Sequence, residues 1–155
     1  MEPERLIAQV LVRHAPTAGG LLPALQEIQE DIGYIPEDAF PAIAEALSLS
    51  VAEVHGVVSF YHDFHTTPVG RHRVQVCQAE SCQAAGGRAL TEHVQQRLGI
   101  SLGETSADGS VSLEPVYCLG NCACSPSVSI DGHSHARVDT ERFDELAAEL
   151  LEEGA

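Results

Sequence analysis

The chain has 155 residues, enough for one ordinary hydrophobic core or for two small modules joined by a short linker. Its 23 acidic residues outnumber its 8 basic ones, all of them arginine, and the formal net charge of -15 disfavours a nucleic acid as its partner. Apolar residues make up 44% of the chain, but no run approaches the roughly 20 apolar residues of a membrane span. The start of the sequence lacks the basic segment of a signal peptide. We therefore expect a cytoplasmic protein without a membrane span.

Helical periodicity characterises the first part of the chain, residues 1–66. After Gly19 and Gly20, apolar residues recur at helical spacing, and Gly33 follows them as a C-terminal stop. The apolar face of this first predicted helix carries Leu21, Leu22, Leu25, Ile28 and Ile32.

Two more helices are predicted before the linker. The second spans about Glu37 to Leu47, and it accommodates Pro41 if its first turn is loosely wound. The third begins at Ser50, which is expected to form a capping box with Glu53. Its apolar face carries Val54, Val57, Val58 and Tyr61. The pattern therefore predicts a small helical bundle over the first 66 residues.

The second part of the chain changes to strand-like alternation, and we place a second domain over residues 67–155. Its first strand, from Arg71 to Val76, ends at Cys77. After Cys82 we expect one amphipathic helix whose N-terminal N–H groups face the cysteine loop. The apolar positions of this helix are Ala85, Ala89, Leu90, Val94 and Leu98, and Gly99 ends it.

Two Asp-Gly pairs predict hairpin turns further along. Asp108-Gly109 leads into a strand that ends at Tyr117, after which Cys118 begins a loop. Asp131-Gly132 is expected to join a strand that ends at Ile130 with a partner near Arg137-Val138.

The chain closes with a predicted amphipathic helix. Thr140 is its expected N-cap, and its apolar stripe carries Phe143, Leu146, Leu150 and Leu151. A strand, a helix, further strands and a helix predict an α+β sandwich of thioredoxin-like outline, without the Cys-x-x-Cys motif of dithiol enzymes.

The cysteines carry the strongest functional signal. In a reducing compartment five cysteines are more typical of metal ligation than of disulfides, and the odd number leaves one unpaired. Cys77-x4-Cys82 and Cys118-x3-Cys122 form two close pairs. Each iron of a [2Fe-2S] cluster takes two thiolates, so two loops that each deliver a pair favour such a cluster.

Two alternatives stay open at this point. Four thiolates also bind a structural zinc ion, which would make the chain an adaptor module without redox function, although zinc usually prefers the tighter Cys-x2-Cys spacing. Cys124 lies two residues beyond Cys122 and could replace a neighbouring ligand, whereas our preferred interpretation is a small apolar filler.

Three stretches of the sequence resemble the small [2Fe-2S] subunit of NADH-linked dehydrogenases. They are residues 58–64, 76–83 and 113–122. The first two, with Phe-Tyr-His-Asp-Phe and Cys-Gln-Ala-Glu-Ser-Cys-Gln, are most similar to the gamma subunit of soluble, molybdenum- or tungsten-dependent, NAD-linked formate dehydrogenase. That subunit is our preferred prediction, and the equivalent subunit of respiratory NADH:quinone oxidoreductase or of NAD-linked hydrogenase is the alternative.

The resemblance implies a fold, a cofactor and partners. The fold is α+β, with an N-terminal helical bundle followed by a thioredoxin-like [2Fe-2S] ferredoxin domain. The cofactor is one [2Fe-2S] cluster, and the four ligands are Cys77, Cys82, Cys118 and Cys122. The partners are a flavin- and NAD-binding subunit, which exchanges single electrons with the cluster, and a molybdopterin subunit that oxidises formate. The chain itself is expected to transfer electrons and to have no catalytic residue.

Overall fold

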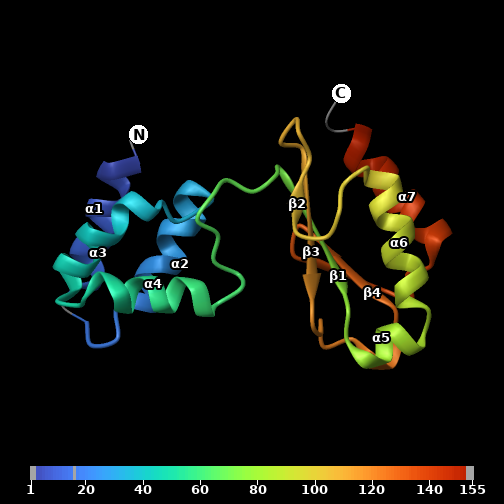
Figure 1. Ribbon diagram of the computed structural model, residues 1–155, viewed down its shortest axis with the longest axis horizontal. Coiled ribbons are helices and arrows are strands. Elements are labelled where there is room, and N and C mark those ends of the chain that lie inside the picture. The colour runs from blue at the N-terminus through green and yellow to red at the C-terminus, as the bar shows by residue number, and fades with distance from the viewer. Residues whose placement is uncertain (1–2, 16, 153–155) are drawn as a thin grey trace. The chain divides into compact units, whose positions relative to one another are not determined.

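The computed structural model describes residues 3–15 and 17–152 (Figure 1). The chain forms two compact units, of which one ends at Pro68 and the other begins at Val69. Among the described residues, the first unit contains only helices, and the second contains a five-stranded sheet with helices. This order of elements agrees with the predicted α+β class.

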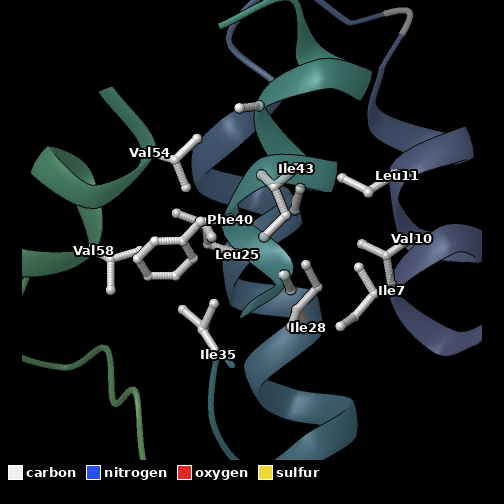
Figure 2. Packing of buried hydrophobic residues seen from close by; sticks show 13 residues of the cluster. Ile7, Val10, Leu11, Leu25, Ile28, Ile35, Phe40, Ile43, Val54 and Val58 are labelled. Carbon is white, nitrogen blue, oxygen red and sulfur yellow. The ribbon is translucent and has the colours of Figure 1, made fainter. Parts of the chain in front are cut away.

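The first unit is a bundle of short helices. Its elements are α1 (Pro3–His14), α2 (Leu21–Ile32), the 3-10 turn η1 (Glu37–Ala39), α3 (Phe40–Leu47) and α4 (Val51–Phe60). Their apolar faces meet in one core, which Figure 2 shows from close by. The side chains labelled there are Ile7, Val10, Leu11, Leu25, Ile28, Ile35, Phe40, Ile43, Val54 and Val58.

Helix α1 is an element that our sequence analysis missed. Ile7, Val10 and Leu11 are buried and follow the i, i+3, i+4 spacing, so the signal was present in the sequence. The last turn of α1 is also tied to α2, because Arg13 and His14 both pair with Glu27. The distance from His14 Nε2 to Glu27 Oε2 is 2.6 Å.

The predicted helix ends in this unit are largely confirmed. Gly33 has a φ of 93°, and its N–H donates to Gln29 O at 2.7 Å, so it ends α2 as expected. Glu53 N donates to Ser50 Oγ at 3.2 Å and Ser50 N donates to Glu53 Oε2 at 2.8 Å, which is the predicted capping box. Tyr61 was placed wrongly on the buried face of this helix. It follows the last residue of α4 and is 43% exposed.

The second unit is built on a mixed sheet in the order β2-β3-β1-β4-β5. Its elements are β1 (His72–Cys77), α5 (Glu80–Ala84), α6 (Gly87–Leu98), β2 (Glu104–Thr105), β3 (Val111–Val116), the 3-10 turn η2 (Cys122–Cys124), β4 (Ser127–Ile130), β5 (His133–Ala136) and α7 (Thr140–Glu152). Strands β1 and β3 are parallel, and the other neighbours are antiparallel. Helices α6 and α7 lie side by side next to the sheet in Figure 1 and share one core with it. That core includes Val74, Val76, Leu90, Val94, Leu113, Val128, Phe143 and Leu146.

The predicted single helix after Cys82 is in fact two helices. Cys82 itself lies inside α5, and α6 begins at Gly87. The break occurs at Gly86, whose φ of 101° is left-handed and cannot continue a right-handed helix. Ala85 and Ala89 are consequently exposed and do not belong to the apolar face.

The last part of the second unit required two corrections. Asp131 and Gly132 form the predicted two-residue turn, with φ values of 49° and 81°. A two-residue turn pairs the residues directly beside it, so the partner strand is β5, which begins at His133 rather than near Arg137-Val138. The prediction of Thr140 as the N-cap of the last helix was also wrong, because Thr140 is the first residue of α7. The side chain of the preceding residue, Asp139, accepts from Arg142 N at 2.8 Å. The side chain of Leu151 lies outside the described residues.

Within the described residues, no single helix is long and apolar enough to cross a membrane. One pair of consecutive helical segments is long and apolar enough only when the two are taken together, and it is bent by 119° at its break. These segments are Glu37–Leu47 and Val51–Phe60.

The turn that contains Asp108 gives a pH-dependent prediction. The Asp108 carboxylate accepts hydrogen bonds from the Ser106 hydroxyl, the Ser110 hydroxyl and the Ser110 N–H, which lower its pKa from 3.8 to about 2. Because the folded pKa lies below the unfolded value, the stabilisation is present above pH 3.8 and is lost as the pH falls through about 2. We expect Asp108→Asn to lower the melting temperature at pH 6 but not near pH 2. A constant difference between the two proteins from pH 6 to pH 2 would contradict this assignment.

Candidate metal centre

The four predicted ligand cysteines lie at one edge of the sheet. Cys77 is the last residue of β1, and Cys82 follows in α5. Cys118 and Cys122 belong to the loop between β3 and β4. Strands β1 and β3 are parallel, with Cys77 beside Val116, so both cysteine loops leave the sheet at the same edge. The topology thus brings together pairs that are far apart in the sequence.

The four thiols are arranged as two pairs of unequal burial. Cys118 Sγ and Cys122 Sγ lie 3.6 Å apart in an exposed loop. Cys77 and Cys82 are each 3% exposed and share a side-chain hydrogen bond. Within the described ranges, no three His, Cys, Asp or Glu side chains are gathered closely enough to hold a single metal ion. Each iron of a [2Fe-2S] cluster takes two thiolates, and two cysteine pairs provide that arrangement.

Backbone and side-chain donors surround the sulfur atoms. Cys77 Sγ accepts from the N–H groups of Ala79 and Leu119, so each cysteine loop contributes one donor. Gly120 N donates to Cys118 Sγ at 3.3 Å, and its φ of 75° is one that glycine adopts without strain. These donors favour negatively charged sulfur, which is the form that ligates iron.

The pKa values of the inner thiols are shifted in opposite directions. Burial raises the pKa of the Cys77 thiol, and the neighbouring Cys82 adds to this shift. Burial also acts to raise the pKa of Cys82, but hydrogen bonds from the Ser125 hydroxyl, from Cys77 and from Ser127 N–H outweigh it and lower that pKa.

In the exposed pair, Cys118 and Cys122, the pKa shift of Cys122 has a different cause. The hydrogen bond with Cys118, and then the charge on that neighbour, raise the pKa of Cys122. Two thiolates held 3.6 Å apart repel each other, and a bound cation removes that repulsion.

Three residues near the cysteines were missed by the sequence analysis. Gly87 is buried, and a Cβ added to it would lie 2.6 Å from the carbonyl oxygen of Cys82, so the close approach of α6 to α5 requires glycine. Ser81 Oγ lies within hydrogen-bonding distance of the Cys122 carbonyl oxygen in the other cysteine loop, and 2.9 Å from Ser125 Oγ. No pattern in the sequence distinguishes these serines from ordinary loop residues, because their partners are remote along the chain.

Cys124, the fifth cysteine, is half-buried in η2. Its N–H donates to Asn121 O at 2.9 Å, and its carbonyl oxygen accepts from Arg137 N at 2.8 Å. These bonds fix its backbone between the ligand loop and the residues after β5. Its exclusion from the ligand set stays a prediction.

Comparison with known proteins shows which family the chain represents. The thioredoxin-like [2Fe-2S] ferredoxin family matches residues 7–151. The chain belongs to this family. Its relatives include a subunit of the NADH-quinone oxidoreductase of Pseudomonas aeruginosa, 42% identical over 115 residues, which cover 74% of this chain and 69% of the relative. The corresponding subunit in Escherichia coli is 36% identical over 123 residues, covering 79% of this chain and 74% of the relative.

Comparison with solved structures agrees with this family assignment. An NAD+-reducing [NiFe]-hydrogenase in its H2-reduced state matches 90% of this chain with a TM-score of 0.73 and 29% sequence identity. The chain spans only 23% of that hydrogenase chain. The thioredoxin-like fold and the [2Fe-2S] cofactor that we predicted are thereby confirmed, and the resemblance to the small [2Fe-2S] subunit of NADH-linked dehydrogenases is confirmed at the level of the family.

Proposed function

We propose that the chain is the electron-transfer subunit of an NADH-dehydrogenase-type complex, and that Cys77, Cys82, Cys118 and Cys122 hold its cluster. A bound [2Fe-2S] cluster accepts and releases one electron at a time. The observation that carries the proposal is the unequal burial of the two pairs, since Cys77 and Cys82 are 3% exposed whereas Cys118 and Cys122 are exposed. The inner pair anchors the site to the sheet, and the outer pair brings one edge of it to the surface.

The chain contributes binding and electrostatics to this function. Leu119 N–H and Gly120 N–H donate to sulfur atoms from within the outer loop, and Ala79 N–H donates from the inner one. Such donors stabilise added negative charge and set the reduction potential of the site. Proton transfer by side chains is not required for this step.

The proposed partner is a flavin- and NAD-binding subunit that approaches the exposed pair. Relatives named as NADH-quinone oxidoreductase subunits and as an NAD+-reducing hydrogenase support this assignment. The strongly acidic chain, with a net charge of -15, would associate fastest with a basic docking surface on that subunit.

The parent complex has three candidates. The relatives named above support an NADH-quinone oxidoreductase or a hydrogenase better than our preferred prediction, a formate dehydrogenase. The formate dehydrogenase candidate, with its molybdopterin subunit, rests on the Phe-Tyr-His-Asp-Phe motif of residues 60–64 and on the residues around the first cysteine pair.

Isolation of the native complex tests the proposal. The tagged chain is purified from its own organism, its co-purifying flavoprotein is identified, and electron transfer is assayed with NADH plus quinone, with H2 plus NAD+, and with formate plus NAD+. We expect a flavoprotein that oxidises or forms NADH. Formate-dependent reduction of NAD+ would select the formate dehydrogenase candidate. Purification of the intact chain without any flavoprotein would contradict the proposed partner.

A further inference from the structure

Two serine hydroxyls join the cysteine loops. Ser81 lies in α5 beside Cys82, and Ser125 follows η2. Their Oγ atoms are 2.9 Å apart, and each lies 3.0 Å from the carbonyl oxygen of Cys122. Ser125 Oγ also lies 3.5 Å from Cys82 Sγ. The two hydroxyls therefore connect a buried thiol with the backbone of an exposed one.

The number of available hydrogen atoms limits how this group can bond. Each serine hydroxyl donates one hydrogen. A cysteine that ligates iron is a thiolate, so both Cys82 Sγ and the Cys122 carbonyl oxygen act only as acceptors. The two hydrogen atoms are therefore shared among the Cys82 sulfur, the Cys122 carbonyl oxygen and the 2.9 Å contact between the two serine oxygens. Ser125 Oγ can donate either to the Cys122 carbonyl oxygen at 3.0 Å or, once Cys82 is a thiolate, to its sulfur at 3.5 Å. When Ser81 donates to that carbonyl oxygen, the Ser125 hydrogen is available to the sulfur, and the contact between the two serine oxygens carries no hydrogen.

We propose that Ser125 raises the reduction potential of the cluster by donating a hydrogen bond to the Cys82 thiolate, and that Ser81 keeps this hydrogen available by satisfying the Cys122 carbonyl oxygen. The inference rests on the proposed ligation by Cys82. Reduction adds one negative charge to the site, so a donor to sulfur stabilises the reduced form more than the oxidised form. Both serines are positioning residues, since they act through a ligand.

The burial of Cys82 makes the effect of this hydroxyl large. Cys82 is 3% exposed and the two serines are half-buried, so water cannot easily replace a lost hydroxyl, and a hydrogen bond is stronger away from water. The lowered pKa of the Cys82 thiol has the Ser125 hydroxyl as its main favourable cause and is consistent with donation to the charged sulfur.

The test is an EPR-monitored redox titration of the cluster-loaded full chain. The proteins are the wild type, Ser125→Ala, Ser81→Ala and the double variant. We expect a lower midpoint potential for Ser125→Ala, and a smaller decrease for Ser81→Ala because the Ser125 hydrogen then turns partly to the free carbonyl. The double variant should match Ser125→Ala, since no hydroxyl hydrogen is left to redirect.

Two further variants serve as controls. Ser101→Ala removes an exposed hydroxyl from the loop between α6 and β2 and should leave the potential unchanged. Ser125→Thr retains the hydroxyl, and residue 125 has an extended backbone that threonine accepts, so this variant should restore the potential towards the wild-type value.

The outcomes separate this inference from the assignment of the ligands. A wild-type potential in Ser125→Ala, or fully additive effects in the double variant, would overturn the inference. If Ser125→Ala cannot hold the cluster, Ser81→Ala decides the question, because an unchanged potential there contradicts the proposal and a lowered one supports it. Cys82→Ser tests the ligation separately, since wild-type iron content and an unaltered EPR spectrum in that variant would remove Cys82 from the ligand set.

Discussion

Replacing Cys77 or Cys118 by serine is expected to remove the [2Fe-2S] cluster and with it most of the bound iron, since changes to residues that merely surround metal ligands already lower metal affinity or activity by about 10- to 100-fold. The two residues represent the two pairs, one buried at the end of β1 and one in the exposed loop. A serine hydroxyl is far less acidic than a thiol and is a poor ligand for iron in a site built from thiolates. Iron analysis and visible absorption of the purified variants measure the loss.

Cys124→Ser is the matched control for this experiment. Cys124 lies in the same loop as Cys118 and differs from it by its place in η2 and by its half-buried position. We expect the iron content and the visible spectrum of Cys124→Ser to equal those of the wild type. Loss of the cluster in Cys124→Ser, combined with retention in Cys118→Ser, would show that the ligand set has been assigned wrongly.

Phe143→Ala is expected to destabilise the sheet-containing unit by about 3–5 kcal/mol. Phe143 is 0% exposed, and it is the largest of the fully buried side chains. It lies in α7 and belongs to the core that this helix shares with the sheet and α6, and its ring packs edge-on against His93 at a centroid distance of 6.4 Å. Truncation leaves a cavity that the surrounding strands can fill only in part.

Urea unfolding, followed by the visible absorption of the cluster, measures this effect. The cluster signal reports on the unit that holds the cysteines. Arg142→Ala is the control at the adjacent position, because Arg142 is exposed and its ion pair with Glu145 at 2.6 Å contributes at most about 1 kcal/mol. Equal midpoints for the two variants would contradict the described packing of α7.

Local sequence signals predicted the features that depend on neighbouring residues. Gly33 and the Ser50–Glu53 capping box define helix ends through contacts within one turn, and Asp131-Gly132 defines a hairpin through its own backbone angles. The pairing of the cysteines into two loops was visible for the same reason, since each pair is separated by only a few residues.

Features that depend on remote partners were not predictable in this way. The break between α5 and α6 comes from the left-handed φ of Gly86, and the need for glycine at position 87 comes from its contact with the Cys82 backbone, which is apparent only in the structure. The contact between Ser81 and Ser125 brings together residues 44 positions apart. Helix α1 is a different case, because Ile7, Val10 and Leu11 carried a clear periodic signal that we did not use.

Iron and acid-labile sulfide analysis of the anaerobically purified chain, with an EPR spectrum after reduction by dithionite, decides whether the chain carries an electron-transfer cluster. We predict two irons and two sulfides per chain and an S = 1/2 signal near g ~ 2, as expected for a [2Fe-2S] cluster with four thiolate ligands. One zinc ion per chain and no sulfide, unchanged after reconstitution with iron and sulfide, would contradict the electron-transfer function and identify the chain as a structural zinc module.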